Sequence, residues 1–193
     1  LKVVFFPYET TRAQLPFLTR MVKKVVEEGG ADSVAVIDTM GVAWPQSVAF
    51  LVRTLKELGD VPIEVHTHHD LHLGVATTLA AVEAGAEVVH VCINGLGERT
   101  GNTSLAEAAM AIRMLLGIEL NLKLDKMYEL AKAVEKISAV PLGYGKPLVG
   151  DVPFTREIGL GMEFVRQAPT AMLPMRPEVV GRQFRLVLGK KSG

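Results

Sequence analysis

The sequence lacks the features that define several classes of protein. It has a single cysteine, Cys92, in 193 residues, so no internal disulfide is possible and a reducing, cytoplasmic location is expected. Its 21 basic residues match its 21 acidic residues with no long run of one sign, which argues against a nucleic-acid partner. Its most apolar stretch, Leu71–Ile93, is broken by charged residues and a glycine, so we expect no membrane span.

Two further signals are missing. Residues 1–6 have no basic region or cleavage site, so they predict a strand rather than a signal peptide, and we expect the chain to be a fragment. No strand is followed by Gly-x-Gly-x-x-Gly, the phosphate-binding turn of an open Rossmann-type sheet. Its absence argues against dinucleotide binding.

Four strand–helix units follow one another along the first part of the chain. Apolar runs predict strands at residues 1–6, 32–37, 61–66 and 87–93, and helical periodicity predicts helices at residues 15–28, 48–58, 71–84 and 105–116. Each helix ends near a glycine, and a Ser-x-x-Glu capping box over residues 104–107 is expected to start the fourth. This alternation is typical of parallel strands joined by crossover helices, either in an open doubly wound sheet or in part of a closed barrel.

Polar residues gather where each predicted strand ends. They include Tyr8 with Glu9, Asp38 with Thr39, the pair His66 and His68, and Asn94. A barrel keeps its active site at the carboxyl ends of its strands. We therefore predict an α/β fold that is part of a closed (β/α)8 barrel. Four strand–helix units make half of a barrel, so either the other half precedes residue 1 or two copies combine to close one.

Two histidines dominate the third strand end. In a strand, alternate side chains point to the same side, so His66 and His68 are expected to project together as possible metal ligands. A hydrogen-bonded structural role is the alternative for an isolated pair. The loop at residues 94–102 favours a site, because it combines three glycines with Asn94, Glu98, Arg99 and Asn102.

The last part of the chain, residues 141–193, has a different pattern. Five prolines lie between residues 147 and 177, and no clear helical period runs through them. The segment is nevertheless too apolar to stand free in water. We predict an extended arm that packs against a partner subunit, which makes the protein a homodimer.

Three segments resemble a known family. They are residues 65–76 (Val-His-Thr-His-His-Asp-Leu-His-Leu-Gly-Val-Ala), 81–86 (Ala-Val-Glu-Ala-Gly-Ala) and 93–102 (Ile-Asn-Gly-Leu-Gly-Glu-Arg-Thr-Gly-Asn). Together they closely resemble the isopropylmalate, homocitrate and citramalate synthases, in the metallolyase superfamily that includes hydroxymethylglutaryl-CoA lyase. Residues 38–41 and 189–193 also resemble the family's Asp-Thr-x-Gly turn and Gly-Lys-His-Ser-Gly segment.

The resemblance implies a fold, a reaction and a set of site residues. The fold is a (β/α)8 TIM barrel of which residues 1–140 form the C-terminal half. A divalent metal (Mg, Mn or Zn), held by His66 and His68 with Asn102 as a further or near ligand, would polarise a 2-oxo acid for attack by an acyl-CoA, acetyl-CoA being the expected donor. Thr39 and Asn94 are the candidate substrate-binding residues. Glu9, Glu98 and Arg99 are the candidate catalytic residues. The family's Asp ligand and Arg on the first barrel strand have no counterpart in this chain.

Two departures from the family pattern keep other functions open. Tyr8 stands where the synthases have an active-site Glu, with Glu9 one place further on, and Gly161 stands where their arm has a catalytic His. His69 and His72 replace the usual Asn and Gly and are not assigned as ligands. A metal-dependent carbon–carbon lyase or aldolase is the second hypothesis. A non-catalytic fragment that needs a separate N-terminal half-barrel is the third.

Overall fold

The computed structural model describes residues 1–192, apart from the side chains of residues 169 and 170. Gly193, the last residue of the segment 189–193, lies outside the described residues. The chain forms two compact units, Leu1–Glu119 and the residues from Leu120 onward. Helix α5 (Met127–Ser138) belongs to the second unit. The predicted domain boundary at residue 140 stays a prediction.

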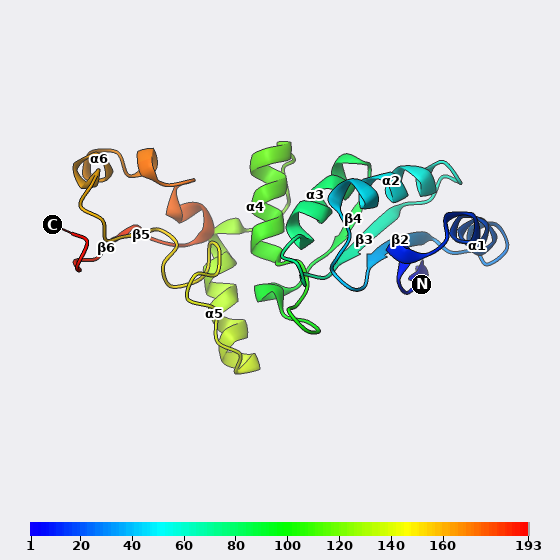
Figure 1. The fold of residues 1–193 in the computed structure, drawn as a ribbon, viewed down its shortest axis with the longest axis horizontal. Coiled ribbons are helices and arrows are strands. Elements are labelled where there is room, and N and C mark those ends of the chain that lie inside the picture. The colour runs from blue at the N-terminus through cyan, green and yellow to red at the C-terminus, as the bar shows by residue number, and fades with distance from the viewer. Residues whose placement is uncertain (193) are drawn as a thin grey trace. The chain divides into compact units, whose positions relative to one another are not determined.

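The first unit is a parallel sheet with connecting helices, as the sequence predicts (Figure 1). Its strands are β1 (Val4–Phe5), β2 (Ser33–Asp38), β3 (Ile63–Thr67) and β4 (Val88–His90). Its helices are α1 (Leu15–Glu27), α2 (Pro45–Lys56), α3 (Gly74–Glu83) and α4 (Leu105–Leu116). The strands lie in the order β1-β2-β3-β4, so each pairs with its neighbour in the chain.

The two faces of this sheet carry different side chains. Val34 and Val36 of β2 and Ile63 and Val65 of β3 are fully or almost fully buried in the hydrophobic core, against apolar residues of α2. Because side chains alternate along a strand, the residues between them point to the opposite face. On β3 that opposite face carries Glu64 and His66.

Three buried threonines hold the end of β3 to the chain around it. The hydroxyl of Thr67 lies 2.6 Å from that of Thr103 and 3.0 Å from that of Thr78 on α3. All three side chains are buried. This network places the segment that leads into α4 beside the strand end that carries the histidines.

The structure differs from the sequence predictions at several element ends. Helix α3 begins at Gly74 rather than Leu71, because His72 has a φ of 57°, which a right-handed helix does not allow. The fourth strand stops at His90, and Ile93–Gly95 form a 3-10 turn in which Asn94 has a φ of 60°. Ser104 precedes α4 as expected, but its side chain makes no capping hydrogen bond in the described part of the chain, so the capping-box prediction is wrong.

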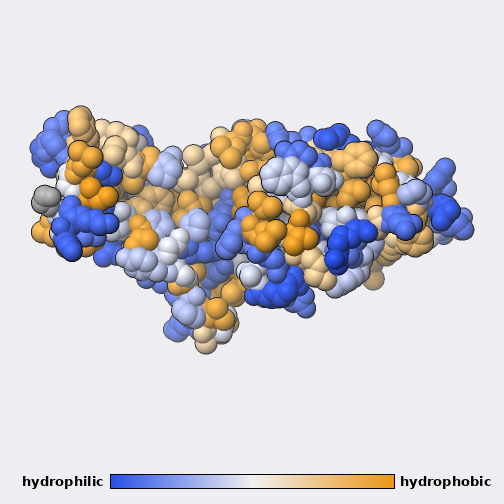
Figure 2. All heavy atoms as spheres, in the orientation of Figure 1, coloured by the Kyte–Doolittle hydropathy of each residue, from blue (hydrophilic) through white to orange (hydrophobic). Residues whose placement is uncertain are grey.

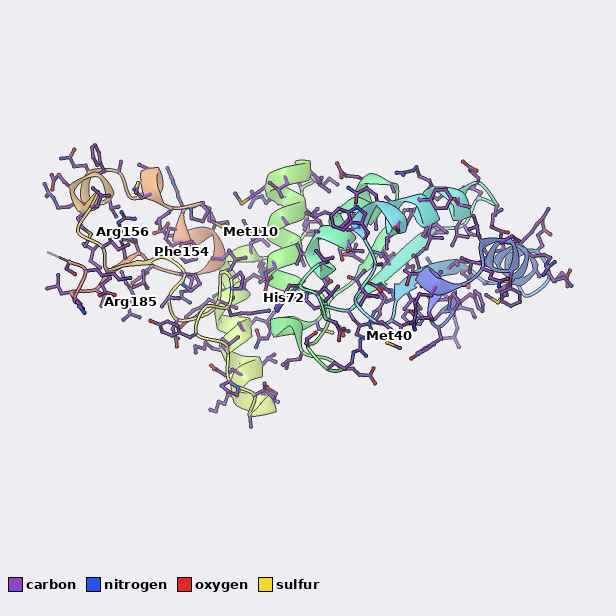
Figure 3. The ribbon with its side chains drawn as sticks, viewed as in Figure 1. Met40, His72, Met110, Phe154, Arg156 and Arg185 are labelled. Carbon is purple, nitrogen blue, oxygen red and sulfur yellow. The ribbon has the colours of Figure 1, made fainter. Side chains whose placement is uncertain are left out.

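The second unit contains α5, the short helix α6 (Met162–Gln167) and a small parallel pair of strands, β5 (Thr155–Arg156) and β6 (Arg185–Leu186). The strand pair, whose Arg156 and Arg185 are labelled in Figure 3, was not foreseen from the sequence, because a two-residue strand carries no alternating pattern. Arg182 is buried: its guanidinium donates to the carbonyl of Gly150 and lies 4.3 Å from the centre of the Tyr128 ring.

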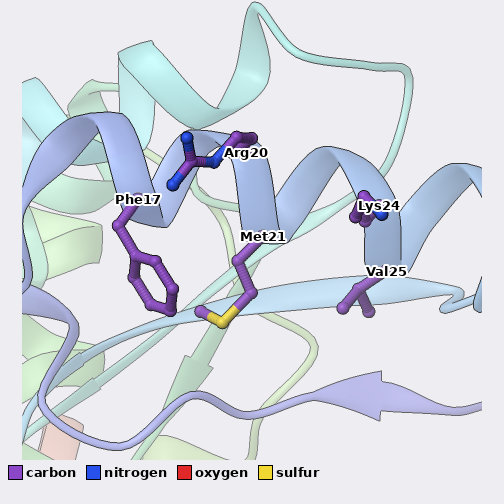
Figure 4. A pocket seen from close by; sticks show the side chains of 5 residues that line it. All are labelled: Phe17, Arg20, Met21, Lys24 and Val25. Carbon is purple, nitrogen blue, oxygen red and sulfur yellow. The ribbon is translucent and has the colours of Figure 1, made fainter.

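Hydrophobic side chains reach the surface in both units (Figure 2). On α1, Phe17, Met21 and Val25 project to one side and line a shallow pocket of about 360 Å³, with Arg20 and Lys24 beside them (Figure 4). None of the helices in residues 1–192 is both long and apolar enough to cross a membrane.

Candidate active site

A pocket of about 150 Å³ opens at the carboxyl ends of β2 and β3. Phe6, Tyr8, Ile37, Thr39, His66, His68 and Glu98 line it. Four of the residues predicted from the sequence therefore meet in one place. The strand order explains the meeting, because parallel neighbours end at the same edge of a sheet.

The two histidines are neighbours among the polar side chains that line this pocket. Their ring centres lie 5.0 Å apart with the planes nearly perpendicular. The Nδ1 of His68 lies 3.1 Å from the carbonyl oxygen of Asp38, which can only accept a hydrogen bond. His68 Nδ1 therefore carries a proton, which leaves Nε2 as the ring nitrogen that can bind a ligand.

His66 is held in its neutral form. Its pKa is lowered from 6.5 to about 4, first by burial and then by the neighbouring rings of His68 and His90. Its Nδ1 is buried and has no hydrogen-bond partner within the described residues. A buried imidazole nitrogen without a partner is costly in a folded chain unless a ligand completes it.

Asn102 lies next to the histidines through the backbone. It forms an isolated antiparallel bridge with His68, and its buried Oδ1 has no partner in the part of the chain that the structure describes. Its Nδ2 donates a 3.4 Å hydrogen bond to Cys92 Sγ. Gly97 has no room for a side chain, because the Asn102 oxygen occupies the place of a Cβ.

These donors fit a divalent cation. Two neutral imidazoles and an amide oxygen are ligand types that Zn²⁺, Mn²⁺ and related ions accept. Among residues 1–192, no group of three or more His, Cys, Asp or Glu could hold a metal. The candidate ligand set is therefore two histidines with one asparagine, which leaves positions for a substrate.

Arg99 connects the loop after β4 to the ends of β2 and β3. Its Nε and Nη2 donate to the two carboxylate oxygens of Asp70 at 2.7 and 2.8 Å, and Nη2 also donates to the carbonyl of Thr39 at 2.7 Å. The hydrogen bond from Arg99 lowers the pKa of Asp70. Because the guanidinium donates to both the Asp70 carboxylate and the Thr39 carbonyl, Arg99 fixes the position of Thr39.

Thr39 lines the pocket and is buried. Its hydroxyl oxygen accepts a 2.9 Å hydrogen bond from the backbone N–H of Glu9. The hydroxyl proton of Thr39 takes no part in that bond, so the hydroxyl can donate it to an oxygen of a molecule bound in the pocket.

The two candidate glutamates have different surroundings. Glu9 has a left-handed backbone (φ 59°) and its side chain pairs with Arg12, so the structure does not place it in the pocket lining. Tyr8, which precedes it, does line the pocket. The Glu98 carboxylate is among the lining residues and is 79% exposed. Asn94 lies in the 3-10 turn after β4 and is not among the described lining residues.

Sequence reasoning missed Asp70, Phe6 and Ile37. Asp70 follows the histidine segment directly, and the pairing of its carboxylate with an arginine 29 residues away has no local signal. Phe6 and Ile37 were assigned only to strands. Both reach the pocket because they lie near the carboxyl ends of their strands, as the polar residues do.

A parallel sheet with a pocket at the carboxyl ends of its strands, in which a few polar side chains lie among apolar ones, is the arrangement of an α/β enzyme domain. The family model described as HMGL-like matches residues 1–134, and the chain belongs to this family. It is 40% identical over its whole length to 2-isopropylmalate synthases of Methanocaldococcus jannaschii and Sulfurisphaera tokodaii, of which it covers 37% and 50%. It is 37% identical to the (R)-citramalate synthase of Methanocaldococcus jannaschii over 96% of the chain and 38% of that protein.

Solved structures show the same fold. HMG-CoA lyase of Bacillus subtilis superposes with a TM-score of 0.66 at 21% identity, over 74% of this chain and 51% of that one. The carboxyl transferase domain of Rhizobium etli pyruvate carboxylase, solved with pyruvate, superposes with a TM-score of 0.51 at 27% identity, over 58% of this chain and 20% of that one. The chain thus spans half or less of the length of the curated relatives named above.

Proposed function

We propose that this chain is part of a divalent-metal-dependent acyltransferase that condenses an acyl-CoA, preferably acetyl-CoA, with a 2-oxo acid. In this proposal residues 1–140 are the C-terminal half of a (β/α)8 TIM barrel and residues 141–193 are an arm that packs on a second copy. The family membership and the isopropylmalate and citramalate synthases among its relatives support the activity. The single observation that carries it is the pocket that joins Thr39 to the two histidines.

His66, His68 and Asn102 are the residues that would hold the metal. When bound, a divalent cation supplies a Lewis acid that polarises the carbonyl of a 2-oxo acid. Three donor atoms are available for it: the unpartnered Nδ1 of His66, the unpartnered Oδ1 of Asn102 and the Nε2 of His68. The zinc, manganese and magnesium alternatives share this ligand set.

Thr39 and Glu98 have separate roles in the proposal. The Thr39 hydroxyl donates to a carboxylate or carbonyl oxygen of the 2-oxo acid, and Arg99 and the Glu9 N–H hold it in place. Glu98 is the carboxylate that lines the pocket and is our candidate base for removing a proton from the acyl methyl group. The enolate carbon attacks the polarised carbonyl carbon, the carbonyl π electrons move to the oxygen, and the resulting alkoxide takes up a proton from water. Hydrolysis of the thioester then draws the reaction forward. Glu9 and Asn94 remain candidates for catalysis and substrate binding.

A carbon–carbon lyase is the second candidate. The arm residue that is a catalytic His in the synthases is Gly161 here, at the N-terminus of α6 with a φ of 77°. Gly161 offers no proton donor or acceptor in its side chain. A carbon–carbon cleavage that needs no arm histidine is therefore compatible with a glycine at position 161.

Release of free thiol from acetyl-CoA separates these functions. The protein is assayed with a thiol reagent, Mn²⁺ or Zn²⁺, and a series of 2-oxo acids of increasing side-chain size. We expect thiol release only when a 2-oxo acid is present, and its loss in Thr39→Val, which keeps the shape of the side chain but removes the hydroxyl. Thiol release without a 2-oxo acid, or cleavage of a hydroxyacyl-CoA in its place, would contradict the condensation.

A further inference from the structure

We propose that Phe6, Glu64 and His90 form a positioning layer that holds the imidazole of His66 in the orientation in which it binds metal. None of the three is a candidate ligand. The inference rests on the proposed metal site, and it adds three residues to the account of how that site is built.

The register of the sheet brings the layer together. In β3, His66 pairs with Ile37 of β2 on one side and with His90 of β4 on the other. Aligned residues of neighbouring parallel strands point to the same face. The rings of His66 and His90 therefore meet on the face opposite the hydrophobic core, with their centres 5.6 Å apart and their planes at 73°.

Glu64 fixes the ring of His90. Its side chain lies two residues before His66 on the same face and is almost fully buried. Ser33 Oγ donates to Oε1 at 2.6 Å, and His90 Nε2 donates to Oε2 at 2.6 Å. With both carboxylate oxygens bound to different strands, Glu64 cannot turn without breaking one of these bonds. The ring plane of His90 is fixed as a result.

The Glu64–His90 pair is ionisable and lies in the sheet, where its presence needs an energetic explanation. Burying a carboxylate costs free energy that a hydrogen bond only partly returns, and an apolar pair of similar volume is often no less stable. What an apolar pair does not give is a fixed ring plane. The Glu64–His90 bond supplies one directly beside a candidate ligand.

Phe6 completes the layer. Its ring stacks almost parallel on His90, with centres 5.4 Å apart and planes at 12°, and it meets the ring of His66 edge-on at 5.4 Å. His66 thus has aromatic neighbours in Phe6, His90 and His68. Rotation of its ring about the Cβ–Cγ bond would lose these edge contacts. The layer therefore presents the nitrogens of His66 in one orientation before any metal arrives.

The experiment compares the purified 193-residue chain with variants, using Co²⁺ as the probe. Its dissociation constant is measured by titration of the Co²⁺ absorption bands, which also report ligand geometry. Histidine side-chain ¹⁵N–¹H spectra of the metal-free protein report the orientation and tautomer of His66. The variants are Glu64→Ala and Phe6→Leu, each paired with a conservative change, Glu64→Gln or Phe6→Tyr. Val65→Ala, next to His66 but in the hydrophobic core, is the control for lost stability.

We expect Glu64→Ala and Phe6→Leu to weaken Co²⁺ binding by about 10-fold or more, the usual effect of removing a group that orients a ligand. In the metal-free variants the His66 signals should broaden or double. Glu64→Gln can still accept from His90, and Phe6→Tyr can still stack, so both should stay close to the wild-type affinity. Val65→Ala should lower the midpoint of denaturant unfolding and leave the Co²⁺ bands unchanged.

Three results overturn the inference, and they differ in whether the proposed metal site still stands. If Glu64→Ala and Phe6→Leu bind Co²⁺ as the wild type does, while His66→Ala does not, the layer has no positioning role and the metal site stands. If Val65→Ala weakens binding as much as Glu64→Ala does, loss of stability explains the effect. If the wild type binds no Co²⁺, the proposed metal site fails and this inference fails with it.

Discussion

Arg99 and Asp70 are joined by two parallel hydrogen bonds of 2.7 and 2.8 Å, although 29 residues separate them in the chain. Arg99 itself has a left-handed backbone, with a φ of 55°. Strain of this kind in a non-glycine residue persists where the surrounding contacts hold it. The pair ties the loop after β4 to the loop after β3, and the third hydrogen bond of Arg99 ties both to Thr39.

Arg99→Lys keeps the positive charge but removes this fork. A lysine can donate to one oxygen of Asp70 but cannot also hold the Thr39 carbonyl in the same geometry. We expect the kcat/KM for the 2-oxo acid to fall by about tenfold or more, since a positioning group is lost. Arg113→Lys, whose 3.4 Å ion pair with Glu119 involves no residue of the pocket lining, is the matched control. Equal losses in the two variants would argue against a special role for Arg99.

Two glycines should respond differently to alanine. Gly101 has a φ of 102°, and a Cβ there would collide with the carbonyl oxygen of Gly95. Gly117, which ends α4, has a φ of 67° but open space around it. Gly117→Ala should cost only the left-handed backbone penalty, about 1 kcal/mol of unfolding free energy. Gly101→Ala should cost clearly more, because the loop must also move. Urea unfolding measures both; equal costs would contradict the tight packing of this loop.

The buried His66 predicts a stability change with pH. Its pKa is about 4 in the folded chain, against 6.5 as the ordinary value. Between these two values the unfolded chain takes up a proton that the folded chain does not, so stability falls as the pH drops from about 6.5 toward 4 and is fully present above that range. Metal-free wild type should lose more unfolding free energy between pH 7 and pH 5 than His66→Asn does. The exposed His72 provides the control, and His72→Asn should behave as the wild type.

Asn102→Ala should produce a smaller loss of metal affinity than either histidine variant. Asn102 supplies one amide oxygen, and its nitrogen binds Cys92 Sγ rather than the pocket. Titration with Mn²⁺ compares the three variants directly. A loss in Asn102→Ala equal to that in His68→Ala would make Asn102 a principal ligand.

The sequence predicts the order of strands and helices in the first unit, because the apolar residues of each element recur over enough positions to define a helical or a strand period. It also predicts that His66 and His68 meet Thr39, since strand ends in a parallel sheet lie together. It does not predict which side chains turn away. The left-handed backbone of Glu9 turns its carboxylate toward Arg12, and that of His72 delays α3, because neither conformation has a signal in residue type. Asp70 and the Glu64–His90 pair depend on register between distant segments, which periodicity alone does not specify.

The most direct test of the metal site is elemental analysis of the chain purified without chelator, together with His66→Ala and His68→Ala. The account predicts about one divalent metal per wild-type chain, as for a single mononuclear site. Both variants should lose the metal and keep the far-ultraviolet circular dichroism of the wild type, because both side chains line the pocket and neither belongs to the hydrophobic core. Full metal occupancy in either variant, or no metal in the wild type, would contradict the account.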